Sequence, residues 1–161
     1  MANTEDKTPD APRPPFPIES VAWEDWAHGD RYGGRVRRLG QFAGATQIGV
    51  NYEELPPGKK SCPSHYHFRE EEHLWILAGS ATLRLGDATH TMSAGDYICF
   101  PAGQRAGHCL INEGEAVCRF LIIGGRDPQE VVVYPDSGKI LVGATDKLYD
   151  IKATKDYWDG E

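Results

Sequence analysis

Short runs in which apolar and polar residues alternate fill the chain from residue 35 to residue 123. Successive side chains of a strand point to opposite faces, so this period of two predicts strands. No stretch in the region keeps the 3.6-residue period of a long helix. The predicted strands span residues 36–41, 46–55, 72–77, 81–85, 89–92, 97–100, 108–111 and 116–123.

Turn sequences rich in glycine and proline separate the predicted strands. They include Pro-Pro-Gly at residues 56–58, Gly-Asp at 86–87 and Pro-Ala-Gly at 101–103. These residue types favour the dihedral angles of tight turns. Short strands at this spacing are typical of an all-β protein that forms a closed barrel or a double-sheet jelly roll.

The segments that flank the strands differ in composition from the body. Residues 1–17 hold five of the eleven prolines, and we expect a disordered arm because they bury too little apolar area to offset chain entropy. Trp23 and Trp26, three residues apart, predict one helical turn docked on the body. A further apolar run spans residues 130–142, and residues 146–161 form a polar tail. The predicted barrel domain with its N-terminal extension therefore spans residues 18–145.

Composition narrows the possible partners. The 161 residues fit one domain, and the formal charge of −7 repels nucleic acid and anionic lipid. No cluster of Lys and Arg reverses that charge locally, so we expect no nucleic-acid partner. No run approaches the roughly 18 apolar residues of a membrane span. Glu5 and Asp6 stand where a signal peptide has its apolar core. These features predict a cytoplasmic protein with no membrane partner.

Four residues carry the candidate chemistry. His65 and His67 flank Tyr66, so on a strand both imidazoles point to one face. Glu72 follows after a short charged loop, and His108 begins a later predicted strand. Three histidines and one carboxylate suit a single divalent Zn, Fe, Mn, Ni or Co ion, with a coordination position left for water or substrate.

Taken singly, these signals have ordinary explanations. A His-x-His pair is often incidental, and the acidic run at residues 70–72 is typical of a solvated turn. Cys62 lies three residues before His65, but we interpret it as a non-ligand because the harder nitrogen and oxygen set is complete without it. Cys99 and Cys118 are interpreted as small buried strand residues.

The spacing of these residues resembles the two sequence motifs of the cupin superfamily. The residues that match the first motif are Gly58, His65, His67, Glu72 and Gly79. The residues that match the second motif are Gly95, Pro101, Gly103, His108 and Asn112. The two motifs occur in the family's order, about thirty residues apart.

This chain departs from the family pattern in two loops. The gap between Gly58 and His65 is one residue longer than usual, and the gap that precedes His108 is two residues longer. The spacing between the motif histidine and the motif asparagine nevertheless fits His108 with Asn112, and does not fit a ligand at the position of Ala106. Glu72 is preferred to the neighbouring carboxylates because it keeps the step to the motif glycine, and a shift of one residue would turn the carboxylate outward.

The resemblance implies a double-stranded β-helix barrel, a metal ion in its mouth and often a homodimer. It implies no substrate. Residues 37–40, 46–51 and 134–136 further resemble a group of bacterial single-domain cupins of unassigned activity, across roughly residues 35–136. The four metal ligands that the resemblance implies are His65, His67, Glu72 and His108.

The alternation of side chains along a strand predicts the direction in which other residues point. His73 should point away from Glu72, and His28 and His90 are interpreted as surface residues. Three further residues are candidates for the pocket wall, although strand phase alone does not place them: Tyr52, Arg119 and Phe120. Trp75 and Leu77 should face outward, and exposed apolar surface of this kind predicts a symmetric homodimer.

Two functions from different classes remain open, because fold does not fix function. The first is a metal-dependent isomerase, dioxygenase or lyase that acts on a small polar or anionic molecule such as a sugar, keto acid or catechol. Glu72 would then stay on the metal or leave it to act as a base. The second is a small-molecule binding or sensing module without turnover. Arg105 is the only basic residue that the second motif offers to a phosphate.

Overall fold

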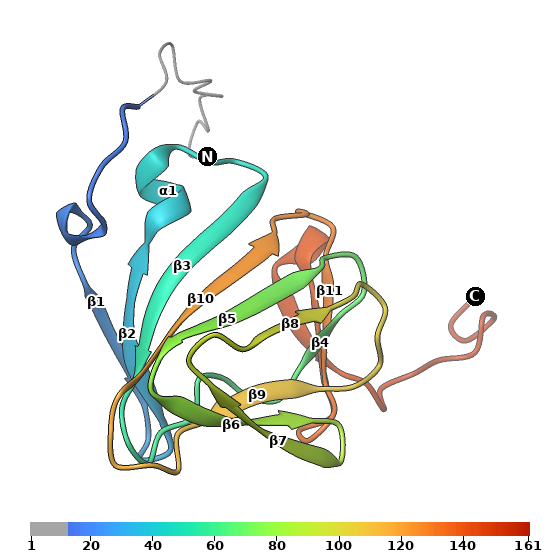
Figure 1. Ribbon diagram of the computed structural model, residues 1–161. Coiled ribbons are helices and arrows are strands. Elements are labelled where there is room, and N and C mark those ends of the chain that lie inside the picture. The colour runs from blue at the N-terminus through green and yellow to red at the C-terminus, as the bar shows by residue number, and fades with distance from the viewer. Residues whose placement is uncertain (1–12) are drawn as a thin grey trace.

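The computed structural model describes residues 13–161, so most of the predicted arm at residues 1–17 lies outside the described part. Almost all regular structure in the described residues is β-strand (Figure 1). The one α-helix there is the single turn α1 (Leu39–Ala43), and two 3₁₀ turns span Ile18–Ser20 and Gly143–Thr145. No helix of the described residues is long and apolar enough to cross a membrane.

Three antiparallel sheets make up the fold. In spatial order, the six-stranded sheet contains β1 (Glu24–His28), β2 (Tyr32–Arg38), β3 (Ile48–Leu55), β10 (Cys118–Gly125), β5 (Glu72–Ala78) and β8 (Tyr97–Phe100). The three-stranded sheet contains β7 (Ala88–Ser93), β6 (Ser80–Leu85) and β9 (His108–Ile111). The four-stranded sheet contains β13 (Lys147–Asp150), β12 (Lys139–Val142), β11 (Val131–Tyr134) and β4 (Tyr66–His67).

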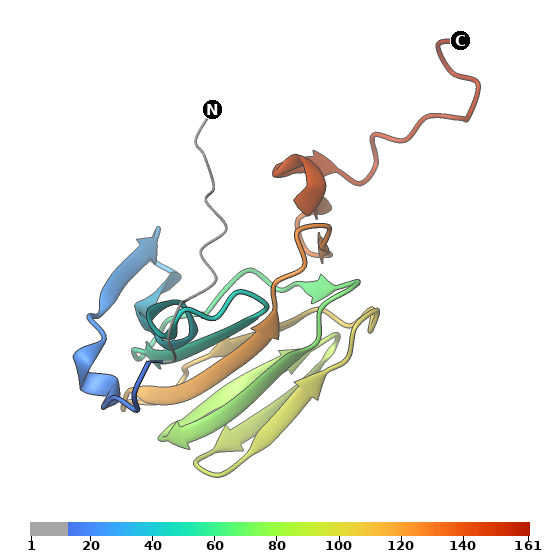
Figure 2. The ribbon, with the colours of Figure 1, turned by 90° about the horizontal axis from the view of Figure 1, so that it is seen from above.

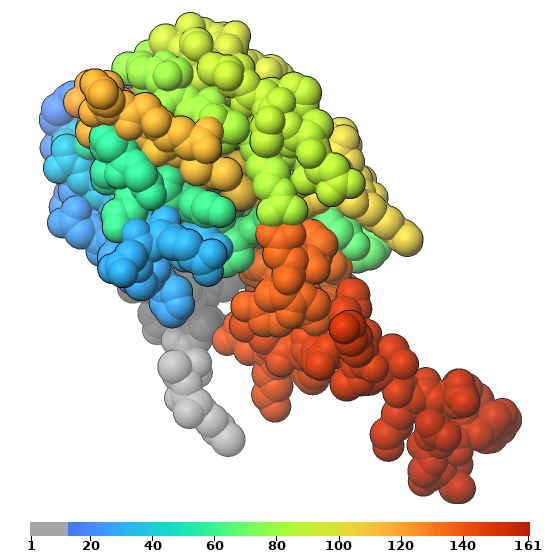
Figure 3. All heavy atoms as spheres, turned by 90° about the horizontal axis from the view of Figure 1, so that it is seen from below, coloured from blue at the N-terminus to red at the C-terminus, as the bar shows by residue number. Residues whose placement is uncertain are grey.

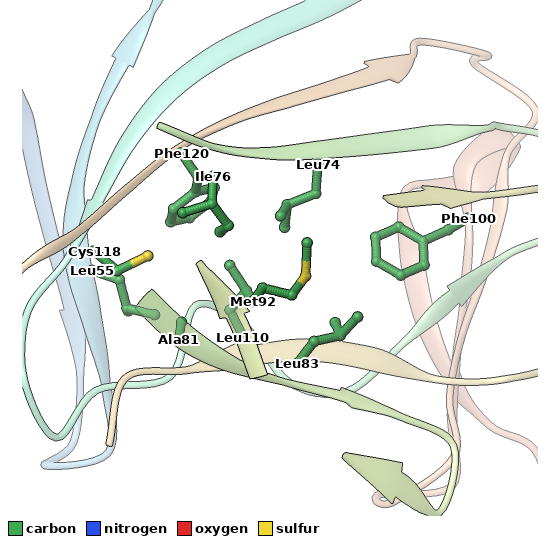
Figure 4. Close-up of a cluster of buried hydrophobic side chains, with 10 residues drawn as sticks. All are labelled: Leu55, Leu74, Ile76, Ala81, Leu83, Met92, Phe100, Leu110, Cys118 and Phe120. Atoms are coloured by element: carbon green, nitrogen blue, oxygen red, sulfur yellow. The ribbon is translucent and has the colours of Figure 1, made fainter. Parts of the chain in front are cut away.

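The hydrophobic core lies between the six-stranded and three-stranded sheets (Figure 4). Leu74 and Ile76 of β5 point into it, while the alternate residues Trp75 and Leu77 stay 48% and 39% exposed. This alternation is the one predicted for the strand. Packing two sheets through such inward faces is the jelly-roll arrangement, so the predicted all-β fold is confirmed.

Some predicted elements are corrected. The predicted helical turn at Trp23 and Trp26 is wrong, because the segment enters strand β1, where Trp26 pairs with Gly34. Pairing with β2 satisfies its backbone groups, whereas an isolated helical turn is marginal in water. Trp23 instead packs its ring 5.4 Å from the ring of Tyr52 on the outer face. Strand β2 also ends earlier than predicted, where α1 begins.

The C-terminal part forms an appendage to the body. The predicted apolar run at residues 130–142 becomes the β11–β12 hairpin, and the predicted polar tail contributes β13. The last residues then extend away from the body (Figures 2 and 3). Strand β4 connects this appendage to the body, because Val132 and Val133 of β11 pair with His67 and Tyr66.

The pairing register of three neighbouring strands determines which side chains line the interior of the barrel. Along β3, β10 and β5, Asn51 pairs with Ile122 and Ile122 with Leu74. Glu53 lies opposite Phe120, two residues further along β3. Because inward side chains repeat every second residue, one strand face presents both polar and apolar groups to the interior.

Candidate metal centre

Four side chains converge at one end of the barrel. His67 ends β4, Glu72 begins β5, His108 begins β9, and His65 lies just before β4 in an isolated bridge with His108. One ligand atom from each of these residues lies within 4.8 Å of all the others. The Nε2 atom of His67 is 3.2 Å from Glu72 Oε2, and that of His108 is 3.4 Å from Glu72 Oε1. The structure thus brings together the four residues predicted from the motifs.

Neighbouring groups orient the imidazoles. The ring of His108 stacks on Phe100, with centroids 3.7 Å apart and an interplanar angle of 7°. His65 Nδ1 lies 2.9 Å from the carbonyl oxygen of Pro63. If Nδ1 carries the proton and donates it there, Nε2 keeps its lone pair for a metal. Packing and hydrogen bonding therefore fix two rings before any ligand arrives.

Two carboxylates stand behind His67. Its Nδ1 atom is 3.8 Å from Glu130 and 3.9 Å from Glu70. Glu130 accepts hydrogen bonds from the backbone N–H groups of Phe68 and Arg69, and Glu70 accepts one from the N–H of Asp127. Both carboxylates are thus engaged with backbone, and they favour a proton on the Nδ1 atom of His67. Carboxylates in this position orient a metal-bound histidine.

The buried ring nitrogens of the cluster indicate whether a metal ion fits there. The buried ring nitrogens of His67 and of His108 make no well-aligned hydrogen bond among residues 13–161, although each Nε2 atom lies near a Glu72 oxygen. Leaving a buried polar atom unsatisfied costs about 1–3 kcal/mol, so native proteins rarely tolerate several together. Imidazole nitrogens with one carboxylate are the donors that divalent transition metals prefer. The residues present therefore fit such an ion.

The protonation states of His65 and Glu72 also suit metal binding. Burial, together with nearby His108, lowers the pKa of His65 to about 4, so its ring is neutral near pH 7. Burial alone would raise the pKa of Glu72, but the imidazoles of His108 and His67 outweigh it and hold that pKa well below its usual range. The cluster thus offers a neutral imidazole and an ionised carboxylate.

The cluster opens into a cavity of about 220 Å³ between the two main sheets. Its apolar wall consists of Leu74, Leu83, Phe100, Leu110, Phe120 and Ile122. Cys62 and Ser61 line it too, with Cys62 Sγ 3.3 Å from Ser61 Oγ. Burial raises the pKa of the Cys62 thiol, which therefore stays protonated and is a poor metal ligand. No Lys or Arg side chain lines this cavity in the described residues.

Asn51 and Glu53 are cavity residues that the sequence reasoning missed. Both belong to the inward face of β3, four and two residues before the buried Leu55. That period of two was the available signal. Of the three predicted wall candidates, Phe120 lines the cavity, whereas Tyr52 packs on Trp23 outside and Arg119 pairs with Glu54.

Two shallower depressions adjoin the cavity and share Asn51 with it. Arg38 lines both of them, and Arg126 lines the one that also contains Glu72. Arg126 can lie against β3 because residue 49 is a glycine. A Cβ atom at Gly49 would be 3.2 Å from Arg126 Nε. The two arginines thus lie at the mouth, beside the carboxyl groups of Glu70 and Glu71, and not inside the cavity. The predicted Arg105 instead lies over the ring of Phe68, outside these depressions.

The remaining histidines stand apart from the cluster. His73 Nδ1 lies 2.6 Å from the hydroxyl oxygen of Tyr97 on the outer face of the sheet. His28 and His90 are exposed, as expected. Among the cysteines, Cys118 is buried and Cys99 is half-buried.

Comparisons with known proteins agree with this geometry. The family model described as a cupin domain matches residues 51–124. Protein SchB from Streptomyces halstedii is 30% identical over 130 residues, which cover 79% of this chain and 88% of SchB. The chain belongs to the cupin family. The resemblance seen in the two motifs is thereby confirmed.

Two solved structures resemble this cupin over most of both chains. One, from Acidithiobacillus ferrooxidans, is described as a candidate sugar phosphate isomerase; it is 29% identical, has a TM-score of 0.79, and the match covers 86% of this chain and 90% of that one. The other is a sugar phosphate isomerase of the cupin superfamily from Silicibacter pomeroyi. It is 32% identical with a TM-score of 0.72, and the match covers 79% and 85%.

Proposed function

We propose that this cupin is a metal-dependent isomerase of a small hydroxy-carbonyl compound, with a sugar phosphate as the leading substrate class. The observation that carries the proposal is the His65, His67, Glu72 and His108 cluster, whose ligand atoms lie within 4.8 Å of one another beside a small cavity. A divalent ion held there would supply a Lewis acid that polarises a carbonyl group. The apolar wall excludes water and strengthens that electrostatic effect.

The distribution of charge supports a substrate with one anionic end. The inner cavity presents the carboxyl groups of Glu53 and Glu72, and its lining holds no Lys or Arg side chain in the described residues. Arg38 and Arg126 lie at the mouth, where Glu70 and Glu71 also line the depression and Arg38 pairs with Glu24. A phosphate would therefore bind outside, and the hydroxy-carbonyl part would enter the cavity. The two similar structures described as sugar phosphate isomerases support the same class.

Metal content is the first test of the proposal. Elemental analysis of protein purified without oxygen should find about one transition-metal ion per chain. Replacing His65 and His67 together by alanine should abolish it. His73→Ala is the matched control, because His73 bonds to Tyr97 on the outer face. Full metal retention in the double variant would contradict the assigned ligands.

Turnover is the second test. The metal-loaded protein should interconvert an aldose phosphate and the matching ketose phosphate without oxygen, as followed by NMR. Oxygen uptake with catechols or keto acids would instead indicate a dioxygenase. Tight binding of these compounds with no product would favour the small-molecule binding or sensing module.

A further inference from the structure

Glu53 is a half-buried carboxyl group that lines the cavity beside the candidate metal cluster. We propose that Glu53 is the proton-transfer group of this cavity: it takes a proton from a substrate carbon and returns it to the neighbouring carbon, while Asn51 binds a substrate hydroxyl. This inference rests on the isomerase function proposed above. It assigns a reactive role to a residue outside the metal cluster.

Glu53 differs from its neighbour Glu54 in having no cationic partner in the part of the chain that the structure describes. Glu54 points to the outer face, where Arg35 and Arg119 lie 2.6 and 2.8 Å from its carboxylate oxygens. Glu53 points inward on the same strand and has no ion pair among residues 13–161. Burying a carboxyl group without a cation destabilises a fold. Such a cost, at a position that lines a cavity, indicates function.

Asn51 supplies a second polar group beside it. Its Nδ2 atom donates a long hydrogen bond of 3.5 Å to Glu53 Oε1. Its Oδ1 atom is buried and has no partner in the described part of the chain. Asn51 lines the cavity and both adjoining depressions. An unsatisfied acceptor at this position is suited to the hydroxyl group of a bound polyol.

The electrostatics suit proton transfer near neutral pH. Burial, reinforced by the charge of Glu72 and opposed by Asn51 and Arg38, raises the pKa of Glu53 to about 7. Both protonation states are therefore populated near pH 7, as an acid–base group requires. The titratable and charged groups that surround Glu53 are Glu72 from β5, Arg38 from β2, Cys62 and His65 from the loop before β4, and His108 and Cys109 from β9.

The proposed step balances without a co-reactant. The C–H bond of a carbinol carbon breaks, and its proton goes to the Glu53 carboxylate. The electron pair forms a carbon–carbon double bond as the adjacent carbonyl oxygen takes up negative charge. Glu53 then returns the proton to the former carbonyl carbon, and the hydroxyl proton passes to the other oxygen. Substrate and product are isomers.

Ligand binding provides a test that needs no known substrate. Glycolohydroxamate mimics the charge and shape of the intermediate, and its affinity for zinc-loaded protein can be measured by calorimetry. We expect Glu53→Gln and Asn51→Ala each to weaken it about tenfold with zinc content unchanged. Glu54→Gln is the matched control and should bind as the wild type does. Equal affinity in Glu53→Gln would overturn the role of Glu53 and leave the metal function standing.

Two further readouts make every outcome decisive. If zinc-loaded wild-type protein fails to bind the hydroxamate, the metal has no open position and both proposals fall. Carbon NMR of labelled glutamate in metal-free protein should show one carboxyl group that titrates near pH 7 and is missing in Glu53→Gln. A Glu53 signal that titrates at an ordinary carboxyl pKa would contradict the proposal. For any isomer pair that is turned over, Glu53→Gln should lower kcat by about a hundredfold or more and change KM little.

Discussion

At the scale of residues, some buried polar groups of this cupin have hydrogen-bond partners within the described residues of the protein and others do not. Asn112 is fully buried, and its Nδ2 atom donates to the carbonyl oxygens of Leu55 and Ala116 at 2.7 and 2.8 Å. Its Oδ1 atom accepts from the N–H of Gly114. The ring nitrogens of His108, four residues earlier, have no such partners in the described chain. The motif asparagine therefore holds the fold together, and the motif histidine belongs to the candidate metal cluster.

Removing Asn112 should cost stability and spare the metal. Asn112→Ala leaves buried backbone groups unsatisfied, and each lost hydrogen bond of this kind costs about 1–3 kcal/mol. We expect a lower urea midpoint with metal content near the wild-type value. Asn51→Ala is the comparison, because Asn51 makes a single long hydrogen bond, and it should lose less. An unchanged midpoint for Asn112→Ala would contradict the structural role.

Glu54 should make stability depend on acid pH. Burial alone would raise its pKa, but the guanidinium groups of Arg119 and Arg35 outweigh it, and the pKa lies below its usual value of 4.5. The unfolded chain therefore binds this proton at a higher pH than the native state does. The stabilisation is fully present above the unfolded value and is lost as pH falls through the folded value.

The Glu54→Gln variant isolates this contribution. The difference in unfolding free energy between wild type and variant should be larger at pH 7 than at pH 3, as measured by urea titration. A difference that grows toward acid pH would show that the sign is wrong.

Site residues could be predicted from the sequence where they belong to a motif with a characteristic spacing. His65, His67, Glu72 and His108 were foreseen in this way, although the presence of the ion itself is still a prediction. Asn51 and Glu53 were not foreseen, because nothing in a short strand tells which of its two faces meets a cavity until the partner strands are placed.

At the scale of elements, the turn between β5 and β6 is held by close contact. Gly79 has φ of +74°, and a Cβ atom there would lie 2.7 Å from the carbonyl oxygen of Val117. Val117 immediately precedes β10, so the turn and that strand meet without room for a side chain. This contact explains the motif glycine in physical terms.

A pair of glycine variants separates contact from backbone strain. Gly95 has φ of +97°, and a Cβ atom there would have nothing within 4 Å, so Gly95→Ala should cost only the conformational strain of about 1–2 kcal/mol. Gly79→Ala should cost about 1–3 kcal/mol more, because the methyl group overlaps backbone. Thermal unfolding of both variants measures the difference. Equal losses would indicate that the contact relaxes freely.

The elements that sequence predicted least well depend on distant partners. The strands seen as β5, β8 and β9 begin where alternation placed them. The Trp23 to Trp26 segment has a spacing that also fits a helical turn, and only pairing with β2 makes it a strand. Strand β4 spans two residues and pairs with β11, over sixty residues away in sequence, which no local pattern announces.

At the scale of the whole molecule, one outer face of the six-stranded sheet exposes large apolar side chains among the described residues. Trp75 and Tyr97 are paired across β5 and β8 and are 48% and 59% exposed. On β3 of the same face, Tyr52 is covered by Trp23. An apolar sheet face of this kind favours association with a second copy. We therefore propose a symmetric homodimer that buries Trp75.

Light scattering at micromolar concentration tests this assembly. Wild-type protein should give the dimer mass, and Trp75→Glu should shift it toward the monomer, because a carboxylate in an apolar interface is unpaired. Tyr157→Glu serves as the control, since Tyr157 is exposed in the C-terminal extension. A monomer mass for the wild type would rule out the dimer.

Three of the four candidate ligands come from the three different sheets of the fold. Glu72 lies in the six-stranded sheet, His108 in the three-stranded sheet and His67 in the four-stranded appendage. An ion at this point would join the four-stranded appendage to the two sheets that share the hydrophobic core, and would merge them into one cooperative unit. Chelation should then raise amide hydrogen exchange in β11 and β12 first, while β5 and β10 stay protected. The same chelation would make unfolding less sharply all-or-none, because the appendage could detach before the barrel opens.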